Sequence, residues 1–182
     1  MSGQDEDFGL WLGDHTDVPG GADGAAHARR QRDVLGQFAT GVTVVTSVHE
    51  DEPVGLTCQS FSSVSLEPPL VLFCVSRTST TWARISQVGH FCVNVLAAAQ
   101  RPLAQAMAIR GPHKFDGVGW RPGVTGSPVI DGVLAYVECR VEAVHTAGDH
   151  EVVVGRILDL GLGSSPDAPP LLFHRGGYAP DA

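Results

Sequence analysis

Two polar stretches of the chain carry the residue types that bind a planar heterocycle with a phosphate tail. Residues 57–65 (TCQSFSSVS) place hydroxyl and amide side chains among strand-forming neighbours. Residues 76–81 (SRTSTT) precede an apolar helical pattern, and Ser79 or Thr80 is a suitable N-cap. Free backbone N–H groups, the helix dipole and Arg77 would together favour a phosphate there. A half-exposed strand and an ordinary capped helix are the plainer interpretations of the same two stretches.

Two shorter motifs lie further along the chain. Gly148, Asp149 and His150 fall between two strand patterns, where a hairpin turn is the alternative to a binding role. His145 and Asp149 could form a metal site with His150, but no third ligand at a suitable spacing supports this, so no metal site is predicted. In residues 113–116 (HKFD), Lys114 could hold an anion and Phe115 could stack on a ring. Taken alone, this last motif is better explained as a surface loop with one buried aromatic.

The sequence lacks the common motifs of catalytic nucleophiles, metal sites and nucleotide-binding loops. It has no GxSxG elbow, no HExxH, no P-loop and no GxGxxG after a strand. The four cysteines form no CxxC motif, and Cys74, Cys92 and Cys139 lie in apolar runs typical of buried thiols. If the protein is an enzyme, a bound cofactor is expected to supply the difficult chemistry.

Composition narrows the class of protein further. A length of 182 residues fits one domain, and a net charge of -8 argues against a general nucleic-acid or acidic-membrane surface. The N-terminus lacks the pattern of a signal peptide, and no apolar stretch is long enough to span a bilayer. We therefore expect a cytoplasmic protein without nucleic-acid or membrane partners.

The elements that must position these motifs are mostly strands. Residues 1–26 are expected to be a flexible tail in which Trp11 and Leu12 dock on a partner subunit, and residues 27–182 to be one domain. Helices are predicted over residues 27–39, 80–88 and 97–109. Strands are predicted over residues 41–48, 54–65, 70–76, 91–96, 134–145, 152–160 and 171–173.

Two of these elements have informative patterns. In the first helix Val34, Leu35 and Phe38 fall on one face. In residues 134–145 the small and apolar side chains alternate with Glu138, Arg140 and Glu142, so the two sets should face opposite ways. Short strands with few crossover helices favour a mainly β fold, an antiparallel barrel that is closed or partly open.

The order and spacing of these pieces resemble the flavin reductase-like family, the reductases of two-component flavin-dependent monooxygenases. The similarity covers residues 38–178 and includes FATGVTVVT, GLTCQSFSSVSLEPPLVLFCV, KFDGV, GDH and PLLFHRGGY. The resemblance implies a flavin-binding split β-barrel with a Greek-key core and a few flanking helices, which forms a homodimer. Where family members often have Ala-Asn, this chain has Cys58 and Gln59.

The family pattern also implies roles for individual residues. His150 would face the nicotinamide and is the candidate catalytic residue, with Tyr178 nearby. The implied cofactor-binding residues are Thr57, Cys58, Gln59, Ser60, Ser62, Arg77, Ser79, Thr80, Lys114, Phe115, Gly148, Asp149, His150 and Tyr178. The implied ligands are FAD, with FMN possible, and NADH, and the implied partner is a separate monooxygenase that receives reduced flavin. Another split-barrel flavoprotein oxidase and a flavin-binding module without turnover are the alternatives.

Overall fold

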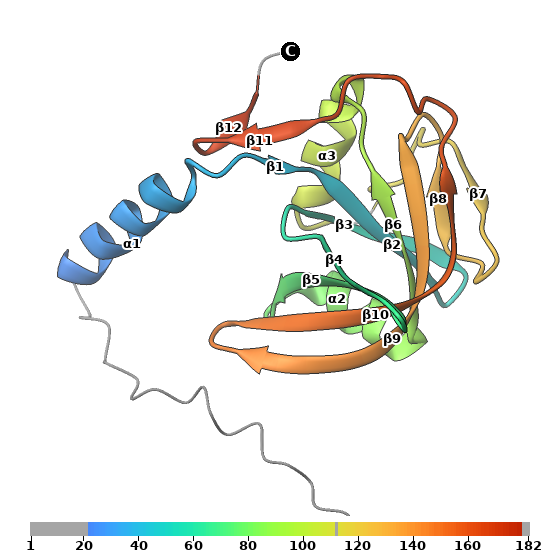
Figure 1. Ribbon diagram of the computed structural model, residues 1–182, viewed down its shortest axis with the longest axis horizontal. Helices are drawn as coiled ribbons and strands as arrows, with labels where there is room; N and C mark the ends of the chain where they lie inside the picture. Colours follow the sequence, from blue (N-terminus) through green and yellow to red (C-terminus); the bar gives the residue numbers. More distant parts are fainter. Residues whose placement is uncertain (1–21, 112, 180–182) are drawn as a thin grey trace, which may run out of the picture.

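The computed structural model describes residues 22–111 and 113–179 (Figure 1). The expected docking residues Trp11 and Leu12 lie outside the described residues. The strands are β1 (Thr40–Gly41), β2 (Thr43–His49), β3 (Glu52–Cys58), β4 (Ser62–Leu66), β5 (Pro69–Ser76), β6 (His90–Val95), β7 (Trp120–Pro122), β8 (Pro128–Ile130), β9 (Ala135–Ala147), β10 (His150–Leu162), β11 (Leu172–His174) and β12 (Gly177–Tyr178). The helices are α1 (Ala22–Leu35), α2 (Thr80–Val88), the 3-10 turn η2 (Ala98–Gln100) and α3 (Arg101–Ala108).

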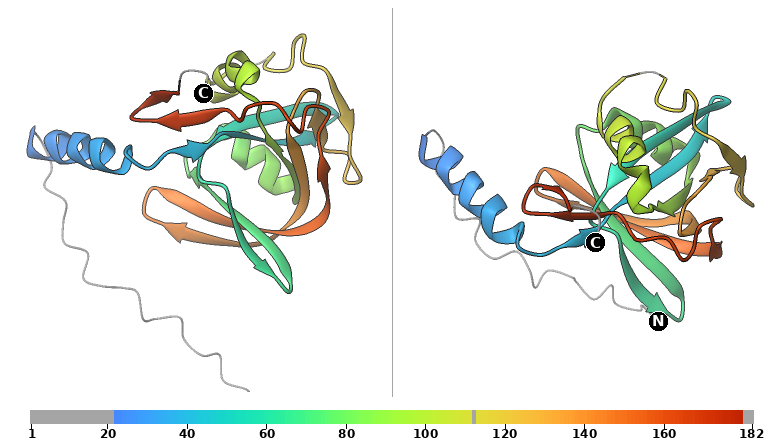
Figure 2. Two further views of the ribbon diagram at one scale, coloured as in Figure 1. Left: turned by 45° about the horizontal axis from the view of Figure 1, so that its top comes forward. Right: turned by 90° about the horizontal axis from the view of Figure 1, so that it is seen from above.

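Seven antiparallel strands form the main sheet, in the order β3-β2-β6-β9-β10-β5-β4. The prediction of a mainly β, antiparallel chain is confirmed. The single extended region expected over residues 54–65 is two strands, β3 and β4, joined by residues 59–61. The two joined strands are the opposite edges of the sheet. Because so short a link spans at most about 14 Å, the sheet curls until its edges approach each other (Figure 2).

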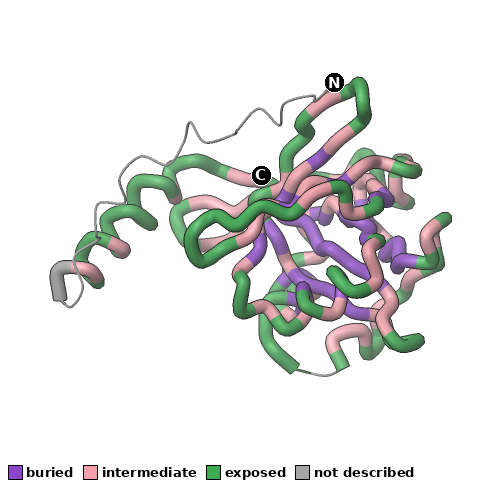
Figure 3. The backbone as a smooth tube through the Cα atoms, turned by 90° about the horizontal axis from the view of Figure 1, so that it is seen from below, coloured by how far each residue is buried: buried purple, intermediate pink, exposed green. Residues whose placement is uncertain are grey.

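Alternating side chains fill the inside of this curled sheet. In β5 Val71, Phe73 and Val75 are buried, and the residues between them are partly exposed. The Phe73 ring meets the rings of Phe91 and Trp82 edge-on, with centroids 5.3 and 5.6 Å away. The buried segments gather in the centre of the molecule (Figure 3).

Helices α2 and α3 pack against β2 and β3 and carry the loops that surround the site described below. The prediction for residues 80–88 is confirmed, and Gly89 ends that helix in the left-handed conformation with φ 76°. The helix predicted over residues 97–109 is shorter, because the 3-10 turn η2 precedes α3. No helix within residues 22–111 and 113–179 is long and apolar enough to cross a membrane.

The first helix differs from its prediction in both position and packing. It begins at Ala22, inside the stretch expected to be a tail, and ends at Leu35, before Phe38. It projects from the body (Figure 1), and Val34, Leu35 and Phe38 are 61, 64 and 78% exposed. The apolar residues that should form a buried face therefore remain exposed among residues 22–111 and 113–179.

Glu138 also departs from the sequence pattern. The alternation in β9 places Glu138 on the same face as Arg140, which is exposed, yet the Glu138 side chain is fully buried. Its carboxylate accepts hydrogen bonds from the N–H groups of Val124 and Thr125, at 2.5 and 3.1 Å, and from the Thr125 hydroxyl at 2.6 Å. The loop between β7 and β8 covers this part of β9 and satisfies the buried charge.

Candidate functional site

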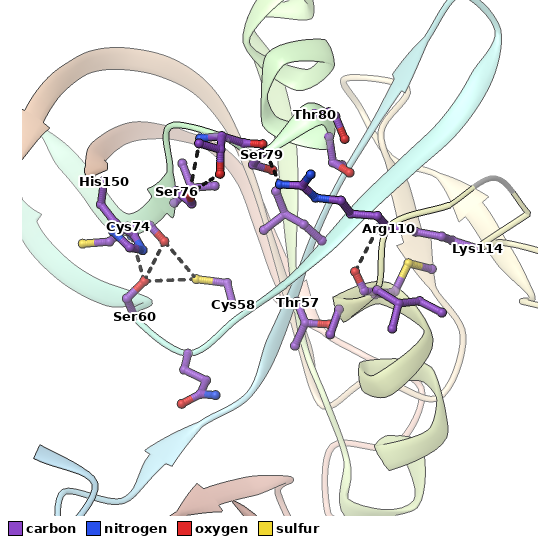
Figure 4. Close-up of a pocket in the computed structure, with 18 of the residues that line it drawn as sticks. Thr57, Cys58, Ser60, Cys74, Ser76, Ser79, Thr80, Arg110, Lys114 and His150 are labelled. Atoms are coloured by element: carbon purple, nitrogen blue, oxygen red, sulfur yellow. Dashed lines mark hydrogen bonds between the residues drawn. The ribbon is translucent and has the colours of Figure 1, made fainter. Parts of the chain in front are cut away.

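A cleft of about 620 Å³ opens beside the gap between the edges of the curled sheet (Figure 4). The end of β3 and the link after it form one wall. The loop from β5 into α2 forms a second, and the C-terminal end of α3 with the following loop forms a third. The start of β10 and the small β11–β12 unit complete the cleft.

The fold brings nine of the residues singled out in the sequence into this one cleft. They are Thr57, Cys58, Gln59, Ser60, Ser79, Thr80, Lys114, His150 and Tyr178. Five others do not line it: Ser62, Arg77, Phe115, Gly148 and Asp149. Ser62 lies on the exposed strand β4, and Phe115 packs partly buried against the apolar cluster under α3.

Hydroxyl groups on the β3 wall are already engaged with backbone atoms. Thr57 Oγ1 donates to the Ala104 carbonyl at 2.5 Å, which ties β3 to α3. Ser60 Oγ accepts from the Cys74 N–H at 2.7 Å and lies 3.1 Å from the Cys74 carbonyl, so it bridges the link to β5. Burial raises the pKa of the Cys58 thiol, which therefore stays protonated and acts as an apolar wall.

The loop before α2 presents backbone donors to the cleft. Ser79 is the N-cap, and its hydroxyl accepts from the Trp82 N–H at 3.1 Å. The N–H groups of Thr80 and Thr81, which both line the cleft, have no partner inside the helix. The first turn contains no acidic residue. This end of α2 therefore suits an anion.

Two cationic side chains reach the same part of the cleft from the opposite wall. Arg110 follows α3, and its Nη2 donates to the Thr78 carbonyl at 3.2 Å (Figure 4). Lys114 Nζ donates to the carbonyls of Gly55 and Met107, at 3.2 and 3.0 Å, and burial lowers its pKa. Lys114 thus ties its loop to β3 and α3. Only Nη2 of Arg110 has a partner among the described residues, so its other donors can bind a ligand.

Charge in the cleft contrasts with the charge of the whole chain. The net charge of the sequence is -8, yet no acidic residue is among the described residues that line the cleft. Arg110 and Lys114 are present together with a helix N-terminus and several hydroxyl groups. A local cluster of this kind attracts an anionic ligand to an otherwise acidic protein.

The turn between β9 and β10 carries His150 to the far side of the cleft. Gly148 makes the turn at φ 63°, and the Arg77 N–H donates to the Asp149 carbonyl at 3.1 Å, which holds the turn against the loop before α2. His150 Nδ1 lies 2.7 Å from Asp149 Oδ1, and the His150 side chain is 47% exposed. This hydrogen bond lowers the pKa of the Asp149 carboxyl. The imidazole is thereby oriented with its Nε2 edge free of this contact.

Tyr178 enters the cleft from β12. Its ring meets Phe173 edge-on at 5.3 Å, and the Arg101 guanidinium lies over it, 5.4 Å from the ring centroid. Burial raises the pKa of the Tyr178 phenol, and the nearby Arg101 partly opposes this. Tyr178 and Phe173 together give the cleft an aromatic side.

Several lining residues are not marked by any motif in the sequence, and Arg110 is the most informative of them. Its only signal was a position just beyond the helix predicted to end at residue 109. Ser76, Thr78 and Thr81 belong to a stretch that was singled out, but without roles of their own. Cys74 and Phe173 were assigned to strands, and strand patterns do not show which side chains border a cleft.

The sequence of this chain is similar to a known protein family and to characterised relatives. The model of the family described as "Flavin reductase like domain" matches residues 35–180. The chain is 51% identical over 150 residues to the flavin-dependent monooxygenase reductase subunit HsaB from Mycobacterium tuberculosis, covering 82% of this chain and 80% of HsaB.

Two solved structures are similar over most of their length. Nitrilotriacetate monooxygenase component B from Mycobacterium thermoresistibile has a TM-score of 0.83 and 49% identity, covering 85% of this chain and 87% of that one. NADH:FAD oxidoreductase SgcE6 from Streptomyces globisporus, in complex with NAD and FAD fragments, has a TM-score of 0.79 and 37% identity, covering 86% and 94%. The chain described here belongs to the flavin reductase-like domain family.

Proposed function

We propose that this protein uses NADH to reduce a flavin and supplies the reduced flavin to a separate monooxygenase. One observation carries the proposal: in an acidic chain, the cleft gathers Arg110, the N-terminus of α2 and His150, and none of the described residues that line it is acidic. The relative HsaB is the reductase subunit of a flavin-dependent monooxygenase, and SgcE6 is an NADH:FAD oxidoreductase. The cleft suits an anionic ligand, and the FAD and NADH on which SgcE6 acts are both anionic.

The residues of the cleft fit both the phosphate and the ring of a flavin. The phosphate would be held by the N–H groups of Thr80 and Thr81 and by Arg110. The ring would lie toward the wall of Cys58 and Gln59, where a thiol and an amide offer a flat, weakly polar surface. Flavin, when bound, supplies a ring that accepts a hydride from the nicotinamide, so no side-chain nucleophile is required.

His150 would contact the nicotinamide dinucleotide at the open side of the cleft. Its ring is anchored through Nδ1 by Asp149, which leaves Nε2 to donate to or accept from a ligand. Hydride transfer places no proton on the nicotinamide, so the imidazole acts by binding and orientation rather than as an acid or base. Asp149 thus serves the site as a positioning residue although it does not line the cleft.

The sheet forms a split barrel in this proposal. Its edge strands β3 and β4 are consecutive in the chain, and Ser60 bonds the link between them to Cys74 of β5. The gap left between the edges is where the cleft opens.

Two copies of the chain pair as a homodimer in this proposal. Val34, Leu35 and Phe38 near α1, and Leu160 and Leu162 on β10, are more than half exposed. Exposed apolar residues in this number are typical of a surface that a second copy covers.

A turnover experiment without oxygen tests the function. A small amount of the protein is mixed with NADH and a large molar excess of FAD. The visible absorbance of oxidised flavin should then fall until the NADH or the flavin is exhausted. A split-barrel oxidase that keeps its flavin would reduce only one equivalent per site, and a binding module would reduce none. Repeating the assay with FMN and with NADPH ranks the cofactors. We expect FAD and NADH to be preferred, since no Arg-rich pocket for a 2′-phosphate is evident in the sequence.

A further inference from the structure

A second, smaller compartment adjoins the cleft on the side away from His150. Its volume is about 310 Å³, at the lower end of the range of roughly 300–1,000 Å³ for small-molecule sites. Thr81 and Lys114 line both spaces, so these two residues form the boundary between them. The turn-proximal end of β3, the exposed side of α2 and the loop around Phe115 form the other walls. We call this space the side compartment.

The charge of the side compartment is balanced, unlike that of the cleft. Arg84 Nη2 lies 3.1 Å from Glu52 Oε2, and His113 Nδ1 lies 3.7 Å from Asp116 Oδ2. The ammonium of Lys114 is directed to two backbone carbonyls. No cation is therefore left uncommitted for a further phosphate among the described residues that line the compartment. A neutral group with hydroxyls suits it better.

Apolar and aromatic surface lies between these ion pairs. Pro53, Val54 and Phe115 line the compartment, and the Phe115 ring packs so near Gly55 that a Cβ there would come within 3.3 Å of it. The ring is held in place by this packing and remains only partly buried. An aromatic face beside carboxylates matches a purine base with a ribose, whose hydroxyls donate to carboxylates.

The order of groups along the two spaces indicates which nucleoside belongs there. Figure 4 places His150 and Ser60 at one side of the cleft and Thr80, Arg110 and Lys114 at the other. A flavin phosphate at Thr80 and Arg110 would therefore lie next to the boundary of the side compartment. The group attached to that phosphate in FAD is adenosine monophosphate. The nicotinamide of NADH would lie instead at the side of His150, at the other end of the cleft.

We propose that the side compartment binds the adenosine of FAD, so that this chain selects FAD over FMN. The inference rests on the proposed flavin site and adds the position of the second half of the ligand. In it the adenine lies against Phe115 and Arg84, and the ribose hydroxyls face Asp116 or Glu52. The pyrophosphate crosses the boundary at Thr81, with Arg110 above it.

Titration of the full chain with oxidised FMN and oxidised FAD tests the inference. FAD should bind at least tenfold more tightly than FMN. Hydrogen exchange with each flavin at saturation should show extra protection of residues 113–118 with FAD only. If FMN fails to bind, the proposed flavin site is wrong. If FMN binds and FAD binds no more tightly, or the loop is equally protected by both, the side compartment does not hold adenosine.

Variants of the side compartment provide the second test. Asp116→Ala and Arg84→Ala should each raise the Kd for FAD severalfold and leave the Kd for FMN within twofold. Asp167→Ala and Arg140→Ala are matched controls, because both residues are exposed and neither lines either space. The KM for NADH is measured with FMN as acceptor. A higher KM for NADH with an unchanged Kd for FAD would assign the compartment to the nicotinamide dinucleotide and overturn the proposal.

Discussion

The indole Nε1 of Trp82 donates a hydrogen bond to Glu151 Oε2 across 2.5 Å. Trp82 is buried in the first turn of α2, whose N-terminus faces the anion end of the cleft, and Glu151 follows His150. One hydrogen bond therefore joins the two ends of the proposed site. This hydrogen bond holds the turn before β10 in a defined position relative to α2.

Removing this hydrogen bond should affect the nicotinamide side first. Glu151→Ala leaves a buried indole N–H without its partner, which costs about 1–3 kcal/mol of folding free energy and lowers Tm by several degrees. Because the turn loses its anchor, the KM for NADH should also rise. Glu151→Gln keeps an acceptor oxygen and should restore most of both properties. Equal losses in the Gln and Ala variants would show that the carboxylate acts in another way.

His150→Ala should raise the KM for NADH severalfold and slow flavin reduction. The Kd for FMN and Tm should hardly change, since a half-exposed turn residue contributes little stability. His145→Ala is the matched control, because His145 is exposed on the same hairpin and does not line the cleft. Steady-state NADH oxidation at saturating flavin measures both variants. Wild-type kinetics in His150→Ala would remove this residue from the site.

The two arginines near the N-terminus of α2 should differ in their effect on flavin affinity. Arg110 lines the cleft and Arg77 does not, so Arg110→Ala should weaken FMN binding by about 1–3 kcal/mol, the scale of a charge-assisted hydrogen bond. Arg77→Ala should have a smaller effect, because its side chain does not line the cleft and the backbone N–H that holds the loop is kept. Riboflavin, which has no phosphate, is the control ligand and should bind both variants like the wild type. The opposite ranking would place the phosphate nearer Arg77.

Charge introduced on the exposed apolar surface should separate the two subunits. Phe38→Glu places a carboxylate where the proposed homodimer buries a ring that is 78% exposed in one chain. Light scattering at micromolar concentration should give the mass of a monomer for this variant and of a dimer for the wild type. Arg30→Ala, on helix α1 just before Phe38, is the control and should stay dimeric. A wild-type monomer would contradict the assembly.

Buried thiols should make the protein less stable in alkali, and Cys92 and Cys139 are the two whose pKa values are raised most. Burial and the nearby Glu138 carboxylate raise the pKa of Cys139 to about 12 and also raise that of Cys92. An unfolded thiol loses its proton near pH 8.5, so the unfolded state binds fewer protons above that pH. Stability should therefore fall as pH rises from about 8.5 toward 12, by up to roughly 1.4 kcal/mol per pH unit for each thiol.

Urea unfolding at pH 8 and pH 10 measures this dependence. Cys139→Ala should show a smaller loss between the two pH values than the wild type, whatever its stability at pH 8. Cys74→Ala keeps both fully buried thiols and should lose as much as the wild type. An identical pH dependence in Cys139→Ala and wild type would exclude the thiol as the cause.

Local sequence patterns were enough to locate α2, the longer strands and the polar stretches around the site. Strand alternation, the Ser79 cap and the Gly89 stop depend on contacts within a few residues, which a local pattern records. The stretches 57–60 and 76–81 could be named because their polar side chains interrupt apolar runs. Their order along the chain also carried the family resemblance.

Which of those side chains line the cleft depends on contacts between segments that are distant in the chain. Ser60 and Thr57 have hydroxyls that could have met a flavin, but they bond to Cys74 and Ala104, residues 14 and 47 positions away in the chain. Glu138 is buried because a loop from elsewhere covers it, and Arg110 reaches Thr78 across the cleft. These contacts join segments that are distant in sequence and are set by how the sheet curls. No local pattern of residues records that curvature.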